Sequence, residues 1–355
     1  MRKLSDFVRD IVPLDEKDAG QSPERGYLAR ELVQCTLPHR DPGELPYYIR
    51  TDGNFTLSVQ PGINPHTKKP YGLPYGSIPR LLLLWLTSEA VRTQSRRIEL
   101  GNSLGEFLED VGLSRDTGRG KRGDAKRLKE QLLRLFSARF SFHYSEGNEQ
   151  KGGHATIEMP LAGQREFWWD FQNPNQAAFF DSYVVLGEEF YKALTSNPVP
   201  FDVNAVKSLK RSPLAIDLYC WLCWRVHRMT PGTSVTIGYR SLQDQFGGEY
   251  SRARDFKTAL SEALEKVEQV LPAVKYELGS RGLVLTGILK KDLPIQSKKA
   301  DPALPFGREP KSPFDLPVQD MLRAGAYSKG WDERVLRTSW EAWCREKGIV
   351  PKQPL

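Results

Sequence analysis

The sequence predicts an α+β fold built from one module that occurs twice. An apolar helix at 78–85 is followed by a short alternating segment, a second helix and a strongly basic third helix that begins at 123–129. The same order recurs between 212 and 257, and this copy closes on two strand-like segments at 274–285. The corresponding closing segment of the first copy is expected at 139–144. Helix, strand, helix, helix and hairpin is the element order of a winged helix, so we expect two tandem winged-helix domains.

Composition divides the chain into four parts. Residues 1–45 are polar, charged and interrupted by prolines, which predicts a flexible N-terminal arm. Residues 46–175 are expected to hold the first winged-helix domain with β-rich additions, and residues 176–293 the second. Residues 294–355 begin as a basic, proline-rich linker and end in a short amphipathic segment, which predicts a helical C-terminal tail.

Positive charge is concentrated on the third helix of the first module. The whole chain has a formal net charge of +7, and between Arg115 and Phe140 there are nine Lys or Arg residues against three acids. Leu128, Leu132 and Leu135 recur at helical spacing and predict a buried stripe, which leaves cations on the outer side. A solvated helix face is the alternative to a phosphate-binding surface, and the module order favours phosphate binding. The candidate DNA contacts of this module are Lys121, Arg122, Lys126, Arg127, Lys129 and Arg134.

The third helix of the second module carries less charge. Phe256, Leu260 and Leu264 form its apolar stripe. Residues early in such a helix reach base edges in the major groove, while the hairpin that follows can touch a neighbouring phosphate. A mixed-charge surface helix without a ligand is the alternative interpretation. The candidate base contacts are Arg252, Arg254, Lys257 and Thr258, and the candidate phosphate contacts near the hairpin are Lys275 and Arg281.

The residue pattern predicts no catalytic centre, no cofactor and no metal site. The glycine-rich segment 117–122 differs from a phosphate-binding loop, because Arg122 stands where such a loop has Ser or Thr for magnesium. The five histidines never flank a single apolar residue, as the metal site of a rolling-circle nicking enzyme requires. Cys220, Cys223 and His227 share a helix face, but no second pair completes a zinc site, so these cysteines are expected in the core.

Three neighbouring aromatic residues, Phe167, Trp168 and Trp169, lie in a β-rich segment after the first module. Their rings suit either stacking on nucleic-acid bases or packing inside the protein. Because buried indole rings contribute strongly to packing, the core is the favoured location.

The remaining features predict a soluble protein of a reducing cytoplasm. Four scattered cysteines do not form a disulfide framework in a chain of 355 residues. The N-terminus lacks the apolar run of a signal peptide. The longest apolar run, 81–86, is too short to span a bilayer, so no membrane partner is expected.

Long co-linear strings between residues 70 and 290 carry a family resemblance. In the first half these strings are Leu73-Pro74-Tyr75-Gly76-Ser77-Ile78-Pro79-Arg80-Leu81-Leu82-Leu83, Glu89-Ala90-Val91-Arg92-Thr93, Leu100-Gly101-Asn102-Ser103-Leu104-Gly105-Glu106-Phe107, Arg127-Leu128-Lys129 and Arg134-Leu135-Phe136. In the second half they are Phe190-Tyr191, Asn197-Pro198-Val199-Pro200 and Ser212-Pro213-Leu214-Ala215-Ile216-Asp217-Leu218-Tyr219. Together they resemble the plasmid-encoded RepA-type replication initiators, a family of tandem winged-helix proteins.

The resemblance implies a protein of the bacterial cytoplasm that binds repeated double-stranded sites (iterons) at a plasmid origin. Such a protein helps to open an AT-rich segment and recruits the host initiator and the replicative helicase. Self-association into dimers or paired complexes would then limit plasmid copy number. None of these steps requires the protein itself to be an enzyme.

Three other functions compete with initiation. A transcriptional repressor uses the same DNA-binding chemistry, but two non-identical modules in one chain favour direct repeats over the palindrome of a dimeric repressor. A DNA-processing enzyme such as a primase or nickase belongs to a different class and is disfavoured by the missing metal ligands and nucleotide loop. A protein-interaction scaffold is the third, because winged helices also serve as docking domains.

Overall fold

The computed structural model of the chain describes residues 24–101, 103–114, 124–148, 151–169, 182–196 and 198–289, together with Gln176, Ala178 and Leu293. Contacts divide the chain into two units, Met1–Phe306 and Gly307–Leu355, and all described residues lie in the first. The expected C-terminal helical tail lies outside the described residues. None of the helices described is both long and apolar enough to cross a membrane.

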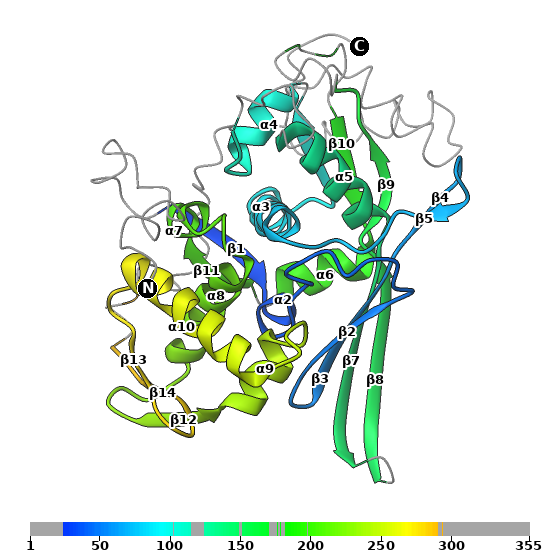
Figure 1. Cartoon of the computed structure of the whole chain (residues 1–355). Coiled ribbons are helices and arrows are strands. Elements are labelled where there is room, and N and C mark those ends of the chain that lie inside the picture. The colour runs from blue at the N-terminus through cyan, green and yellow to red at the C-terminus, as the bar shows by residue number, and fades with distance from the viewer. Residues whose placement is uncertain are drawn as a thin grey trace, which may run out of the picture. The chain divides into compact units, whose positions relative to one another are not determined.

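The first unit combines helices with strands of different lengths (Figure 1). The N-terminal half forms β1 (Arg25–Ala29), α2 (Arg30–Gln34), β2 (Tyr48–Asp52), β3 (Phe55–Gln60), β4 (Ile63–Asn64), β5 (Lys69–Pro70), α3 (Ser77–Thr93), β6 (Arg97–Gly101), α4 (Leu104–Asp110), α5 (Asp124–Ser137), β7 (Arg139–Asn148), β8 (Lys151–Pro160) and β9 (Ala162–Glu166). The remainder forms β10 (Ser182–Leu186), α6 (Glu188–Ser196), β11 (Pro198–Asp202), α7 (Val203–Ser208), α8 (Pro213–His227), β12 (Ser234–Gly238), α9 (Tyr239–Phe246), α10 (Ala253–Val270), β13 (Lys275–Leu278) and β14 (Gly282–Thr286).

The second winged-helix domain is present in the expected order. Its elements follow as α8, β12, α9, α10, β13 and β14, and its sheet has the strand order β12-β14-β13. The last strand lies in the middle, with Leu283 opposite Ile237 on one side and Leu278 on the other. Helix α10 is the third helix of this domain, the one that enters the major groove in DNA-binding winged helices.

The first winged-helix domain has the same topology but a different closing hairpin from the one expected. Its elements are α3, β6, α4, α5, β9 and β10, and its sheet order β6-β10-β9 repeats the arrangement of the second domain. The expected closing segment 139–144 instead belongs to β7, in a separate four-stranded sheet of order β2-β3-β7-β8. Strand β7 is hydrogen-bonded to β3 on one edge and to β8 on the other, so no edge remains to receive β6.

Two expected boundaries also move because strands far apart in the sequence pair with each other. β10 lies beyond residue 175, yet it pairs with β6 and completes the first domain. Within the expected flexible arm, β1 pairs with β11 and the Tyr27 N–H donates to the Ser88 hydroxyl over 2.8 Å. The next residues form α2, which buries Leu32 and Val33. The arm was expected from its polar composition, and in residues 25–34 buried tertiary contacts override that local signal. Residues 1–23 of the expected arm lie outside the described residues.

The first helices of the two domains form the centre of the core. Every residue of α3 from Ile78 to Ala90 is buried, and α8 is buried from Leu214 to Cys223. A helix that is apolar on all sides is stable in water only when other elements surround it. α3 and α8 pack against each other and are covered by strands and helices of both domains.

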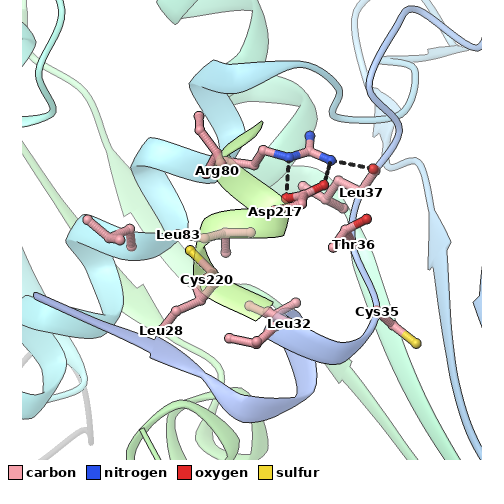
Figure 2. Close-up of a pocket in the computed structure, with 12 residues that line it drawn as sticks. Leu28, Leu32, Cys35, Thr36, Leu37, Arg80, Leu83, Asp217 and Cys220 are labelled. Carbon is pink, nitrogen blue, oxygen red and sulfur yellow. Dashed lines mark hydrogen bonds and ion pairs between the residues drawn. The ribbon is translucent and has the colours of Figure 1, made fainter. Parts of the chain in front are cut away.

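One charged pair lies inside this apolar contact. Arg80 of α3 donates to both carboxylate oxygens of Asp217 of α8, from Nε and Nη2, each over 2.7 Å. Its remaining N–H groups donate to the carbonyls of Leu37 (2.6 Å), Pro38 (3.0 Å) and Gly76 (2.7 Å). A guanidinium has five N–H donors, and all five are used here. Figure 2 shows the pair with its contact to Leu37, beside a small pocket that is lined mainly by apolar side chains.

His39 completes the surroundings of the Asp217 carboxylate. Its Nε2 lies 2.8 Å from Asp217 Oδ2, and because a carboxylate only accepts, Nε2 carries the proton. Burial lowers the pKa of His39 and keeps the ring neutral. Burial by itself would raise the pKa of Asp217, but the Arg80 charge and the hydrogen bonds from His39 and Arg80 outweigh it and hold that pKa at about 2.

Replacing Asp217 is expected to destabilise the whole described fold. Asp217→Asn keeps the shape but leaves the buried Arg80 charge without its counterion, which typically costs about 3–5 kcal/mol of unfolding free energy. Urea denaturation followed by circular dichroism measures this loss. Glu188→Gln, which removes an exposed ion pair with Lys192, serves as the control and should leave the midpoint unchanged.

The same substitution is expected to change the acid stability. A carboxyl whose pKa is lowered on folding stabilises the native state above its ordinary pKa, and this contribution is lost as pH falls through the folded value. For Asp217 the window runs from 3.8 down to about 2. The urea midpoints of wild type and Asp217→Asn should therefore converge across this window, and a constant difference would contradict the assigned role.

Candidate nucleic-acid interface

The second domain presents a helix-turn-helix formed by α9, the turn 247–252 and α10. The turn begins at Gly247, where a Cβ would lie 2.4 Å from the ring of Phe256. Phe256 is fully buried, as are Leu260 and Leu264, so the predicted apolar stripe of α10 is confirmed. A glycine is therefore required for the close approach of the two helices.

The residues expected to read bases lie exposed at the start of α10. Arg252 is the N-cap residue and has an extended backbone, and Arg254 follows in the first turn. Thr258 is exposed one turn later, and its hydroxyl donates to the Arg254 carbonyl over 3.2 Å. Arg254 and Thr258 are four positions apart and share the outer side of the helix, opposite the buried stripe, which is the side that a major groove would contact. Arg252 is exposed immediately before this side begins.

Lys257 differs from its neighbours because it has an aromatic partner. Its Nζ lies 3.9 Å from the ring centre of Tyr239, the first residue of α9. The Tyr239 hydroxyl in turn donates to the carbonyl of Gly279, in the hairpin turn between β13 and β14, over 2.9 Å. Lys257 is exposed and cationic, but it also fixes α10 against α9 and the hairpin.

The hairpin carries the two predicted phosphate contacts on its surface. Lys275 begins β13 and Arg281 lies in the turn before β14, and both are exposed. Gly282 follows, where a Cβ would lie 2.0 Å from the Ile237 carbonyl oxygen. This close packing on β12 holds the turn, and with it Arg281, beside the helix-turn-helix.

In the first domain, α5 has the predicted division into two faces. The side chains of Leu128, Leu132 and Leu135 are at most 1% exposed. Three predicted DNA contacts, Lys126, Arg127 and Lys129, are exposed. The other two predicted contacts before them, Lys121 and Arg122, lie outside the described residues.

Arg134, the last predicted contact on α5, is bound within the protein. Its side chain is 14% exposed, and its Nη2 donates to Glu130 over 2.6 Å. Nη1 donates to the Leu73 carbonyl over 3.1 Å, and the guanidinium lies 5.0 Å from the Tyr75 ring centre. Helical spacing places Arg134 on the flank of α5 where segment 72–75 packs, so we expect it to hold this segment, and its contact with DNA stays a prediction.

The aromatic cluster at 167–169, which follows β9 within the first domain, divides between core and surface. Trp169 is buried, donates from Nε1 to the Gly101 carbonyl over 2.8 Å and stacks on Phe107 at 4.8 Å. Phe167 is partly buried and packs against the core. Trp168 is 50% exposed, so the expectation of burial is wrong for this residue. The rings of Phe167 and Trp169 stack on each other at 5.9 Å between centroids, while Trp168 between them is exposed.

The cysteines of α8 lie in the core, as expected. Cys220 and Cys223 are buried, and burial raises the pKa of Cys223 to about 12. Burial also raises the pKa of Cys220 well above the ordinary value. Because metal ligation and nucleophilic attack use the thiolate, both thiols are suited to packing rather than chemistry.

Two residues that shape this surface are absent from the sequence-based assignment. Tyr239 holds Lys257, and Glu249 in the turn before α10 contacts the N-terminal part of the chain. The paired glycines at 247–248 do signal a turn between two helices. No local pattern indicates the partners of Glu249. One of them, His39, lies 210 residues earlier in the chain.

Comparison with known proteins gives one family match. The model of the family RepA_C, plasmid-encoded RepA protein, matches residues 73–239, from the segment before α3 to the first residue of α9. No curated protein matches the chain significantly. The solved structure of domains 2 and 3 of RctB, as a selenomethionine derivative, is similar with a TM-score of 0.46 and 11% identity. That alignment covers 73% of this chain and 96% of the RctB chain.

The exposed cations of α5 and the partly buried Arg134 are expected to differ in a salt titration of DNA binding. Replacing Lys126 and Arg127 together by Gln should weaken DNA binding and reduce the slope of log K against log salt by about 1.8, or 0.9 per lost phosphate contact. Arg134→Gln should lower the melting temperature and leave the slope unchanged. Fluorescence anisotropy with labelled duplex DNA measures the slopes. If Arg134→Gln also made the slope of log K against log salt shallower, Arg134 would be assigned to a phosphate contact.

Proposed function

Because residues 73–239 match the family model of plasmid-encoded RepA protein, we propose that this chain initiates plasmid replication by binding repeated sequences at the plasmid origin. The observation that carries the proposal is a pair of winged-helix domains whose third helices, α5 and α10, both present exposed cations. In this proposal the protein contributes binding and no catalytic step of its own.

The two domains would have different tasks on the DNA. Exposed lysines and an arginine on α5 suit phosphate contacts, which set position and register. The first turns of α10 present Arg254 and Thr258, which suit donor and acceptor patterns on base edges. Farther along α10, Glu265 is exposed and would repel phosphate, so only the first turns enter the groove.

Unequal modules favour direct repeats as the target. A symmetric dimer of one module matches an inverted repeat, whereas two different modules joined in one chain read a site without internal symmetry. Several such chains bound side by side on direct repeats would bend or untwist the adjacent duplex, and the deformation cost is lowest in flexible AT-rich steps. Recruitment of the host initiator and helicase, and self-association that limits copy number, complete the proposed role.

A repressor without an initiation role is the second candidate, because it would use the same surface of α10. Binding to fragments of the source replicon separates the two. Purified full-length protein is mixed with tiled fragments and excess nonspecific DNA at several salt concentrations. Salt-sensitive retention of one fragment with direct repeats supports initiation, and retention of an inverted repeat at a promoter supports repression. No preference among the fragments would contradict both.

Arg254 is expected to determine sequence preference. Arg254→Ala should cost about 1–3 kcal/mol on the preferred site and relax discrimination at one base position, because a bidentate base contact is lost. Lys275→Ala on β13 is the matched control and should weaken binding to all sequences alike. Competition with singly substituted sites measures both effects. Uniform weakening by Arg254→Ala would remove this residue from base readout.

A further inference from the structure

The helix-turn-helix of the second domain is held by residues from the N-terminal part of the chain. Gln245 of α9 donates from Nε2 to the Gln34 carbonyl over 2.9 Å. Arg50 of β2 donates from Nη1 to the carbonyl of Asp244, also on α9, over 3.3 Å. We name Gln34, His39, Arg40 and Arg50 the N-terminal clamp.

The centre of the clamp is Glu249, in the turn that leads into α10. Its two carboxylate oxygens accept the backbone N–H groups of His39 (2.6 Å) and Arg40 (3.2 Å). The Arg50 guanidinium, whose side chain is 3% exposed, lies 3.8 Å from the same carboxylate. Charged acceptors make the stronger hydrogen bonds in proteins, and a carboxylate held from two sides fixes the direction of the turn.

Two further contacts restrict the same turn. The Arg40 guanidinium lies 5.4 Å from the ring centre of Tyr250. A Cβ at Gly248 would lie 2.5 Å from Arg50 Nη1, so the turn approaches the clamp as closely as a glycine permits. The residues immediately before α10 are therefore packed on the N-terminal segment and not only on their own domain.

The clamp is also fixed to the first domain. The Leu37 and Pro38 carbonyls accept from Arg80 of α3, directly before His39 in the chain. Arg50 lies on β2, which pairs with β3, and β3 pairs with β7, the strand that begins two residues after α5. Two hydrogen-bonded paths, through Arg80 and through the sheet, thus connect α3 and α5 with the turn before α10.

We infer that the N-terminal clamp sets the distance and rotation between α5 and α10, and so determines the number of base pairs between the two DNA segments that these helices contact. The inference rests on the proposed function. One added base pair moves a site by about 3.4 Å along the axis and turns it by about 35°. A rigid connection cannot follow that rotation, whereas two domains on a loose linker can. Glu249 is a positioning residue in this arrangement and does not itself contact DNA.

The test compares spacing preference in variants of the full-length chain. Wild-type protein first selects its site from a random duplex library. Duplexes are then made in which one or two base pairs are added or removed between the two contacted segments, and binding is measured by anisotropy. The wild type should lose about tenfold in affinity, or 1.4 kcal/mol, for one added base pair. Glu249→Ala should bind the optimal site with similar sequence preference but lose less than about threefold upon the same insertion.

Controls separate positioning from general stability. Glu44→Ala removes one exposed carboxylate from the same N-terminal segment and should keep the wild-type spacing profile. Glu249→Gln keeps one acceptor oxygen and should give an intermediate profile. Thermal melts identify a variant that fails to fold. If Glu249→Ala is such a variant, Glu249→Gln and Arg40→Ala carry the test.

The outcomes distinguish the inference from the function on which it rests. If Glu249→Ala keeps the wild-type spacing profile, the inference about the clamp is wrong, while sequence-specific binding is unaffected. If Glu249→Ala does not fold, a wild-type spacing profile in both Glu249→Gln and Arg40→Ala has the same meaning. Failure of the wild type to select any sequence would remove the proposed function and the inference together. A broadened profile with unchanged sequence preference supports both.

Discussion

The buried ion pair between Arg80 and Asp217 is the interaction on which the arrangement of the two domains depends. It joins the first helix of one winged helix to the first helix of the other, at the centre of the apolar contact between α3 and α8. The position of this guanidinium is fixed, because its five N–H groups donate to one carboxylate and three backbone carbonyls. The two domains and the segment at 37–39 therefore meet at this ion pair.

A buried pair of this kind is better suited to specifying an arrangement than to adding stability. Removing two charges from water costs free energy that their attraction does not always recover, and apolar residues of similar volume can be equally stable. Apolar side chains, however, tolerate sliding of one helix along another, while hydrogen bonds of defined direction do not. In a protein whose two third helices face one DNA molecule, a fixed relation between α3 and α8 is the property that matters. Neutral His39 supports the arrangement without adding a second positive charge beside Arg80.

The two domains share a topology but differ in how their charge is used. On α5 three exposed cations lie within residues 126–129, while on α10 the exposed cations at the start of the helix are followed by exposed acids. Two arginine residues also serve the structure: Arg134 of the first domain holds the segment before α3, and Arg50 of β2 contacts the turn before α10. Net charge alone therefore overstates the DNA-binding surface, because a buried guanidinium counts equally in composition and contributes nothing to phosphate contact.

The sequence by itself determined the features that follow from local periodicity. The element order of both modules, the leucine stripe of α5, the stripe of Phe256 and its neighbours on α10, and the exposed cations opposite them can all be predicted from spacing, because the pattern of apolar residues sets which side of a helix is buried. Only the tertiary structure decided which strands pair. It assigned β10 to the first domain, placed β7 in a separate sheet and ordered β1 and α2, since pairing between distant strands leaves no local signal in the chain. It likewise decided that Arg134 donates to the Leu73 carbonyl and that Glu249 accepts from the His39 N–H, because these partners are set by the packing of distant segments.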